Sequence, residues 1–356
     1  MASIHDLPEE IILKMVNFLE LKEIAKFGEV SKRMRAISRI QSLWQKINLL
    51  KYRPGRWSYE IDVPTGFLKM AIENGCQYLS LRYMKLGTAG QPISMTSEGD
   101  FCLDKASNLK YLDLKYCDAH VLTFEEILAS CHSLQKFSMA SKGAPPTHEP
   151  TLEKSACLTS NMIRCISYQN GHTLQTLNLR GCSGLDLESI QKITKNCVKL
   201  KNIDFALTEL SKDSINFLVT NLNLKVEKID LGSLRNFTDE HLKALVTRCN
   251  KLSVLNLLNT SITNDSLTHI IENLQQTLEK LDVYMCDDVT YAKLTKLKSM
   301  PKLKDLNYMV SAAEIQDLKN VMPFIRIGEI ITADERELSP ADGIWDVETE
   351  QLEFFM

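Results

Sequence analysis

The sequence predicts an α/β fold in which an N-terminal helical unit leads into a curved solenoid of repeated strand–helix units. A short apolar pattern recurs eight times at a nearly constant spacing, and after each copy the apolar period changes from that of a strand to that of a helix. The first 48 residues instead carry helix signals. A chain of 356 residues exceeds one ordinary domain, and a solenoid accommodates such length by stacking units instead of enlarging one core.

Residues 1–48 are expected to form three helices. Pro8 suits the first helical turn, and Glu9 and Glu10 suit the positive end of a helix. The second helix is expected over 21–30 and the third over 31–47. A unit of this size buries too little to be secure alone and carries more apolar residues than three short helices hide, so we expect it to bind a partner.

The repeat itself has the form L-x-x-L-x-L, typical of one short strand in a leucine-rich repeat. We call the three apolar residues of each copy its anchors. The first anchors of successive copies are 25 or 26 residues apart, except for one gap of 40 residues. The anchor triplets are 109-112-114, 134-137-139, 174-177-179, 200-203-205, 226-229-231, 252-255-257, 278-281-283 and 303-306-308. Two weaker copies, 44-47-49 and 76-79-81, precede them, which gives about ten repeats over 44–331. Long spacings predict inserted loops near 84–104 and 141–157.

Each strand is followed by apolar residues at i, i+3, i+4 and i+7, which predict one buried helix face per repeat. Because strands and helices differ in width, the stack should curve, with strands on the concave face and helices on the convex face. Asp213, Thr238 or Asp239, and Asn264 or Asp265 are candidate helix caps. The ten cysteines form no CxxC pair, and most fall at equivalent repeat positions, so we expect buried free thiols.

The run Leu7-Pro8-Glu9-Glu10-Ile11-Ile12, with Phe18-Leu19, Val30-Ser31-Lys32-Arg33 and Leu43-Trp44 at their spacing, resembles the F-box. Met34 stands where that family usually has Trp. With the repeats behind it, the whole chain resembles the F-box/leucine-rich-repeat family. The resemblance implies that the chain is the substrate-recognition subunit of an SCF-type ubiquitin ligase. The implied contacts with the S-phase-kinase-associated adaptor protein, and through it a cullin–RING ligase, are Leu7, Pro8, Glu10, Ile11, Leu19, Leu21, Val30 and Trp44.

Two columns of residues are expected to line the concave face, where an unidentified protein substrate would bind. Between the last two anchors of each strand lies an acid- and amide-rich column, and after the last anchor lies a column that turns from basic to apolar. The basic part suits an anionic substrate element. The substrate-binding residues predicted from both columns are Arg82, Asp113, Lys115, Arg180, Asp204, Asp230, Asn256, Asp282 and Tyr284.

The remaining function classes are disfavoured. The formal net charge of -3 does not favour nucleic acid, and no signal segment or membrane-length apolar run is evident. Without catalytic motifs or metal-ligand spacing, we expect neither an enzyme nor a metal or cofactor site. The expected location is cytoplasmic, nuclear or both. Residues 332–356 form an acidic tail, 323–331 should cover the last repeat, and a repeat scaffold without ligase role is the alternative function.

Overall fold

The computed structural model describes residues 4, 7–17, 19, 21–49, 62–63, 65–86, 108–140, 158–309 and 312–327. The N-terminal unit contains helices α1 (Glu9–Val16), α2 (Leu21–Phe27) and α3 (Lys32–Ser38) and the short 3-10 turn η2 (Gln41–Leu43). Ser31 caps α3 by accepting the Met34 amide at 3.2 Å. The third helix is shorter than predicted, because the chain leaves it after Ser38 to enter the first strand.

The solenoid is built on one parallel sheet of 11 strands in the order β1-β3-β5-β7-β8-β9-β10-β11-β12-β13-β14. The strands are β1 (Lys46–Asn48), β3 (Tyr78–Ser80), β5 (Tyr111–Asp113), β7 (Lys136–Ser138), β8 (Thr176–Asn178), β9 (Asn202–Asp204), β10 (Lys228–Asp230), β11 (Val254–Asn256), β12 (Lys280–Asp282), β13 (Asp305–Asn307) and β14 (Arg326–Ile327). A second sheet, in the order β2-β4-β6, joins β2 (Asp62–Val63), β4 (Lys85–Leu86) and β6 (Asp118–Ala119). Strand β14 adds a rung inside the segment that was expected to cover the last repeat.

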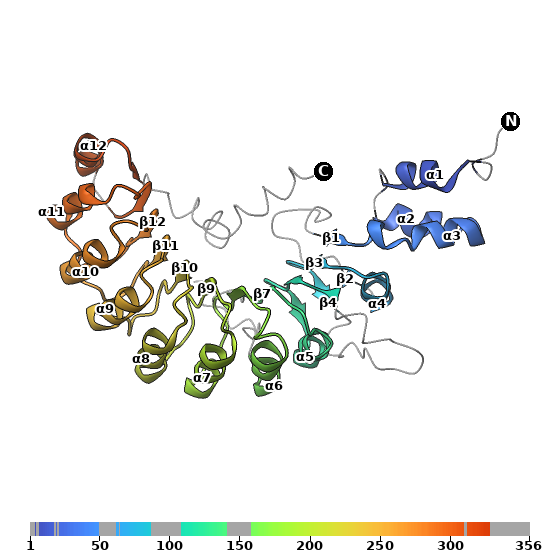
Figure 1. The fold of residues 1–356 in the computed structure, drawn as a ribbon, viewed down its shortest axis with the longest axis horizontal. Coiled ribbons are helices and arrows are strands. Elements are labelled where there is room, and N and C mark those ends of the chain that lie inside the picture. The colour runs from blue at the N-terminus through green and yellow to red at the C-terminus, as the bar shows by residue number, and fades with distance from the viewer. Residues whose placement is uncertain are drawn as a thin grey trace, which may run out of the picture.

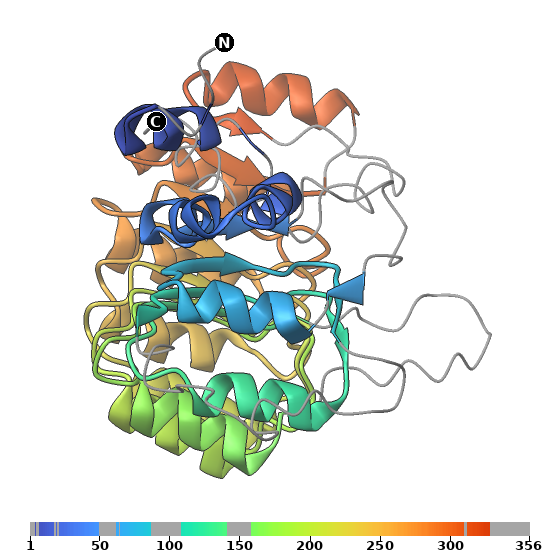
Figure 2. The same cartoon turned by 90° about the vertical axis from the view of Figure 1, so that its right-hand side faces the viewer.

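The helices of the repeats lie on the outer side of this curved stack, and the strands lie on the inner side (Figure 1). They are α4 (Thr65–Glu73), α5 (Val121–Ala129), α6 (Ser160–Arg164) with the π-helical turn η5 (Cys165–Gln169), α7 (Leu187–Asn196), α8 (Lys212–Asn221), α9 (Asp239–Arg248), α10 (Asn264–Leu274), α11 (Tyr291–Leu294) with η6 (Thr295–Ser299), and α12 (Ala312–Val321). Seen from the N-terminal side, α1 to α3 lie over one end of the stack (Figure 2). The predicted α/β solenoid behind a helical unit is therefore confirmed.

Helix caps fall slightly earlier than predicted in two repeats. Ser211, not Asp213, accepts the Ser214 amide at the start of α8, and Thr263 caps α10. Thr238 caps α9 in a reciprocal pair with His241. Each cap lies in the turn that follows a strand, where an extended residue must precede the first helical one.

The core is a continuous apolar layer between strands and helices. The leucine-type anchors fill it, and Leu177, Leu231 and Leu257 have no exposed surface. The eight described cysteines are free thiols, and all but the half-buried Cys117 are buried. The expectation of buried structural thiols is confirmed for these seven.

Thiol labelling tests this packing. Burial raises the pKa values of Cys131 and Cys197 to about 12, so almost no thiolate forms at mild pH. We expect iodoacetamide to leave both unmodified in the native protein at pH 8 and to modify both in urea, while Cys117 reacts earlier. Mass spectrometry of peptides reads this out, and labelling of native Cys131 as fast as Cys117 would contradict the buried placement.

Several predicted features lie outside the described residues. These are most of the predicted loop near 84–104, the whole of 141–157, and the acidic tail 332–356. Among the described residues, no helix is both long and apolar enough to cross a bilayer.

Candidate partner-binding sites

Helix α1 carries apolar side chains on two opposite sides. Ile12 and Val16 face inward and are 0% and 1% exposed, whereas Ile11 and Met15 face solvent at 42% and 48%. Residues four apart lie on one side of a helix, so Ile11 and Met15 form one apolar strip. Sequence reasoning left Met15 out of the predicted contact set, although its spacing from Ile11 was the signal that places it there.

The other predicted adaptor residues differ in exposure. Pro8 and Glu10 are exposed at the start of α1, and Leu19 and Val30 are exposed at 36% and 64%. Leu7 is half-buried and packs against the core, and its carbonyl accepts a hydrogen bond from the Arg33 guanidinium at 2.7 Å. Leu21 begins α2, and its side chain is outside the described set. Their role as adaptor contacts stays a prediction.

Trp44 requires a correction, because it lies inside the molecule. Its side chain is 1% exposed and its indole N–H donates to the Ser38 carbonyl at 2.6 Å. Its ring also lies 6.2 Å, centre to centre, from the ring of Phe67 on α4. Trp44 thus joins the N-terminal unit to the first repeats and does not present a surface to an adaptor. Met34, at the departure from the family pattern, is also fully buried.

The acid- and amide-rich column, which was expected to line the concave face, is a largely buried ladder. Strand pairing aligns Asn178, Asp204, Asp230, Asn256 and Asp282 on successive rungs. Asp204 and Asp230 are 1% and 2% exposed, Asn178 and Asn256 are 3% and 7% exposed, and Asp282 is half-buried.

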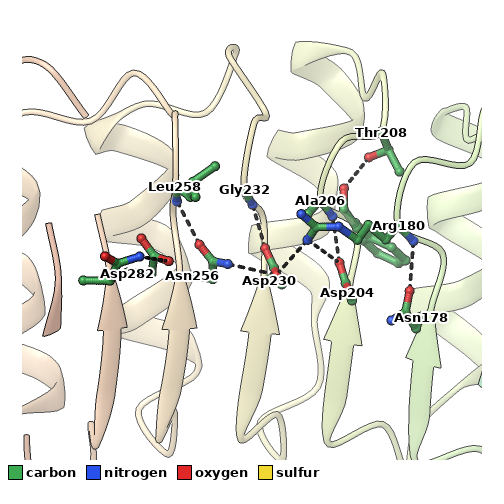
Figure 3. Close-up of polar contacts among 12 residues, drawn as sticks. Asn178, Arg180, Asp204, Ala206, Thr208, Asp230, Gly232, Asn256, Leu258 and Asp282 are labelled. Carbon is green, nitrogen blue, oxygen red and sulfur yellow. Dashed lines mark hydrogen bonds and ion pairs between the residues drawn. The ribbon is translucent and has the colours of Figure 1, made fainter. Parts of the chain in front are cut away.

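One Oδ1 oxygen on each of these rungs accepts the amide of the residue two positions later. The amide donors on the last four are Ala206, Gly232, Leu258 and Tyr284, at 3.0, 2.9, 2.9 and 2.9 Å. Figure 3 shows the first three of these bonds. A short side chain with an oxygen at this distance from the backbone is needed for such a turn, which explains why Asp and Asn recur there.

Bonds between rungs also tie the ladder together. Arg180 lies over two carboxylates, 3.2 Å from Asp230 and 4.0 Å from Asp204, and Asn256 donates to Asp230 at 3.0 Å. Figure 3 shows Arg180 reaching across from its own strand end to both rungs. At the N-terminal end, Arg82 forms a similar buried pair with Asp113 at 2.9 Å.

Two of the three cations predicted to hold an anionic substrate element are therefore engaged within the chain. Arg82 faces the Asp113 carboxylate, Arg180 faces two carboxylates of the ladder, and Lys115 is 3% exposed. Asp113, Asp204, Asp230 and Asn256 are likewise used by the fold. Contact of any of these residues with a substrate stays a prediction, as it does for Asp282 and the half-buried Tyr284.

The ladder holds one carboxyl group in an unusual state. Burial, and next the neighbouring Asp230 carboxylate, raise the pKa of Asp204 to about 7, against the opposing effect of Arg180. Its Oδ2 oxygen is buried without a hydrogen-bond partner in the described part of the chain. A raised folded-state pKa means that the folded chain binds this proton more tightly than the unfolded chain does. The stability that this group contributes is therefore full below about pH 4 and is lost as the pH rises through about 7.

Asp204→Asn should remove the loss of stability that accompanies ionisation of this carboxyl group. Asn keeps the oxygen that accepts the Ala206 amide, as the neighbouring Asn178 and Asn256 rungs do. We expect the free energy of unfolding in urea of the variant, minus that of wild type, to be larger at pH 8 than at pH 5. The exposed Asp213→Asn variant measures the baseline for losing one negative charge. A difference between Asp204→Asn and wild type that is the same at both pH values would contradict the raised pKa.

A row that the sequence did not single out follows the ladder. Six non-glycine residues, each three positions after the last residue of a strand, adopt left-handed backbone with φ from 53° to 64°: Tyr83, Tyr116, Leu207, Ser233, Asn259 and Met285. We call this row the rim. Leu207 and Met285 are 43% and 45% exposed, and the Tyr83 and Tyr116 rings stack at 4.8 Å. Left-handed backbone is unfavourable for such residues, and clusters of it favour a functional surface.

Comparison with known proteins identifies the family. The family model described as the SKP2 LRR domain matches residues 84–334, and an F-box-like model matches residues 4–50. The chain belongs to the F-box/leucine-rich-repeat family. The match to the F-box-like model covers α1 to α3 and Trp44, so the buried Trp44 and the exposed strip on α1 both belong to the F-box of this F-box/leucine-rich-repeat protein.

Individual relatives of this F-box/leucine-rich-repeat protein are distant. F-box/LRR-repeat protein 17 of Arabidopsis thaliana is 26% identical over 227 residues, which cover 53% of this chain and 38% of that relative. The chain thus spans less than half of that relative's length.

Two solved structures match this chain at low sequence identity. A chain in the crystal structure of the Rad7 and Elc1 complex in yeast has a TM-score of 0.48 at 15% identity, covering 93% of this chain and 96% of that chain. The leucine-rich repeat-containing protein LegL7 from Legionella pneumophila has a TM-score of 0.40 at 12% identity, covering 76% and 94%. The family assignment rests on the two family models.

Proposed function

We propose that this protein is a substrate-recognition subunit of an SCF-type ubiquitin ligase. In this proposal the F-box binds the S-phase-kinase-associated adaptor, and the repeats hold a protein substrate for ubiquitination and proteasomal degradation. The observation that carries it is an F-box with an exposed apolar strip at one end of a long curved repeat stack. Ubiquitin transfer itself would be performed by other subunits, in the cytoplasm, the nucleus or both.

The docking half is supported by the surface of α1. Ile11 and Met15 expose nearly half of their side chains although Ile12 and Val16 already supply the inner side of this helix. Pro8, Leu19 and Val30 are exposed in the same small unit. Apolar side chains gathered on one small unit are typical of a protein interface.

The substrate half is supported by the rim more than by the ladder. The side-chain oxygens of the ladder accept hydrogen bonds from backbone amides of the turns and from side chains of adjacent rungs. The rim exposes Leu207 and Met285, with Met309 beyond them at 50%. We therefore place the apolar part of the substrate contact on the rim, at the carboxyl ends of the strands.

A double variant tests the docking half. Ile11→Asp/Met15→Asp should weaken adaptor binding at least about 30-fold, since central apolar contacts commonly contribute about 2 kcal/mol or more. Both side chains are exposed, so the variant should fold as wild type does. The matched control is Val198→Asp/Phe324→Asp, which places the same charges on side chains that are 52% and 93% exposed in the repeats. Isothermal titration calorimetry with purified adaptor gives all three affinities.

Each outcome decides between the two functions considered. Tight adaptor binding by wild type and by the control, with loss of adaptor binding in the F-box variant, supports the proposed ligase function. A folded wild-type chain that does not bind the adaptor overturns it in favour of a repeat scaffold. If the adaptor binds but turnover of a captured substrate does not depend on the F-box, the chain is an adaptor-bound scaffold.

The proposed boundaries remain 1–48 for the F-box, 44–331 for the solenoid and 332–356 for the tail.

A further inference from the structure

A groove of about 1000 Å³ lies on the helix side of the solenoid, between the C-terminal part of α8 and the neighbouring helix α9. Its apolar lining comes from Val219, Leu224 and Ala244. Leu224 follows α8 and is 58% exposed, a large apolar side chain left in solvent. The helices lie on the outside of the curve (Figure 1), so this groove is on the other side of the chain from the rim.

The sides of the groove are strongly basic. Lys225, Lys243, Arg248 and Lys251 line it with a single acid, Glu240, so four cations stand against one anion. Lys225, Lys243 and Lys251 are exposed, and none forms an ion pair with another described residue. Arg248 differs, since its Nε–H donates to the Leu222 carbonyl at the end of α8.

Some lysines at or beside the strands, unlike the three groove lysines, are paired with an acid of an adjacent rung. Lys201 contacts Glu227 at 2.9 Å, Lys304 contacts Glu279 at 2.8 Å, and Lys280 contacts Asp305 at 3.5 Å. Cations near helix C-termini are favoured by the partial negative charge there, but that effect does not explain an exposed leucine between them. Unpaired cations and an apolar lining together indicate a bound partner.

We propose that this groove, defined by Val219, Leu224, Lys225, Lys243, Ala244 and Lys251, binds an acidic segment of a partner protein that carries an apolar side chain. The segment's carboxylates would face the three lysines, and its apolar side chain would rest on Leu224 and Ala244. The groove lining contains no aromatic side chain on which a nucleotide base could stack. A hollow with a single exposed leucine also does not provide a convex apolar wedge for a membrane. This site is independent of the proposed ligase function.

Fluorescence anisotropy with the full chain tests the proposal. The probe is a labelled peptide, Glu-Asp-Glu-Leu-Phe-Glu-Asp-Glu, and a second peptide has Ser in place of its Leu and Phe. We expect the first peptide to bind more tightly than the second and to weaken as salt is raised. Lys225→Glu/Lys243→Glu/Lys251→Glu should reduce its affinity about 10-fold or more, and Leu224→Ser should reduce it several-fold.

The matched control is Lys296→Glu/Lys298→Glu/Lys302→Glu, which makes the same charge change on exposed lysines near α11. Its affinity for the peptide should stay within about 2-fold of wild type, because screening weakens distant charges. Equal loss in the control, equal binding of the serine peptide, or no binding by wild type would overturn the proposal. Tighter binding of a single-stranded oligonucleotide or of anionic vesicles, lost in the groove variant, would overturn it in favour of that partner.

Discussion

Trp44→Ala is expected to detach the F-box from the repeats and to lower the free energy of unfolding of this region by about 3–5 kcal/mol. The indole is 1% exposed, donates to the Ser38 carbonyl at 2.6 Å, and lies near Phe67 on α4. Its removal leaves a large cavity and an unpaired carbonyl at the junction. Hydrogen exchange of residues 9–49 should rise strongly, whereas residues 200–283 should stay protected, because solenoid repeats depend mainly on their neighbours.

Trp44→Phe is the matched control for this prediction. It retains a ring in the same space and loses the bond to Ser38, so we expect a loss of only about 1–2 kcal/mol. Unchanged exchange of residues 9–49 in Trp44→Ala would contradict the buried placement of this side chain. Adaptor binding of the alanine variant should fall through loss of F-box order, which distinguishes Trp44 from the exposed Ile11 and Met15.

Asn170→Ala is expected to be the most damaging polar substitution in the repeats, at about 3–5 kcal/mol. Its side chain has no exposed surface, accepts the Leu134 amide at 2.9 Å and donates to the Cys131 carbonyl at 2.9 Å. These partners lie 36 and 39 residues earlier, so Asn170 joins two repeats across the longest gap in the pattern. Removing it leaves buried backbone groups without these bonds.

Urea unfolding of Asn170→Ala beside Asn196→Ala measures this effect. Asn196 also donates through its amide, at 3.0 Å to the Lys192 carbonyl, but that acceptor belongs to its own helix. We expect Asn196→Ala to lose no more than about 1 kcal/mol. Similar losses in both variants would mean that the bonds between repeats contribute no more than a bond within one helix.

Local patterns account for the parts of the molecule that were predicted well. The spacing of leucine anchors places every three-residue strand from β3 to β13, since alternation along a strand and the helical period that follows are properties of neighbouring residues. The inner side of α1 follows from the same rule. The end of α3 at Ser38 was not predicted, although the weaker repeat copy at 44-47-49 indicated the strand that pairs with Tyr78–Ser80.

The candidate sites depend more on contacts between distant residues. A column of Asp and Asn residues looks solvated in the sequence, yet Asp204 is buried because the next rung stacks on it and its oxygen is needed by the Ala206 amide. Asn170 looks like an ordinary turn residue until the preceding repeat supplies its partners. The rim depends on left-handed backbone at residues such as Leu207 and Met285, which have no sequence preference for it.

The F-box, the repeat period and the side on which each strand and helix buries its apolar residues follow from short-range periodicity, so they could be predicted from the chain alone. Which polar residues are used within the fold depends instead on how the repeats stack. Stacking adjacent repeats places Arg180 over Asp204 and Asp230, packs Trp44 against α4, and leaves Lys225, Lys243 and Lys251 exposed around Leu224 with no ion pair to another described residue. Burial and ion pairing depend on neighbours that are a whole repeat away in the chain.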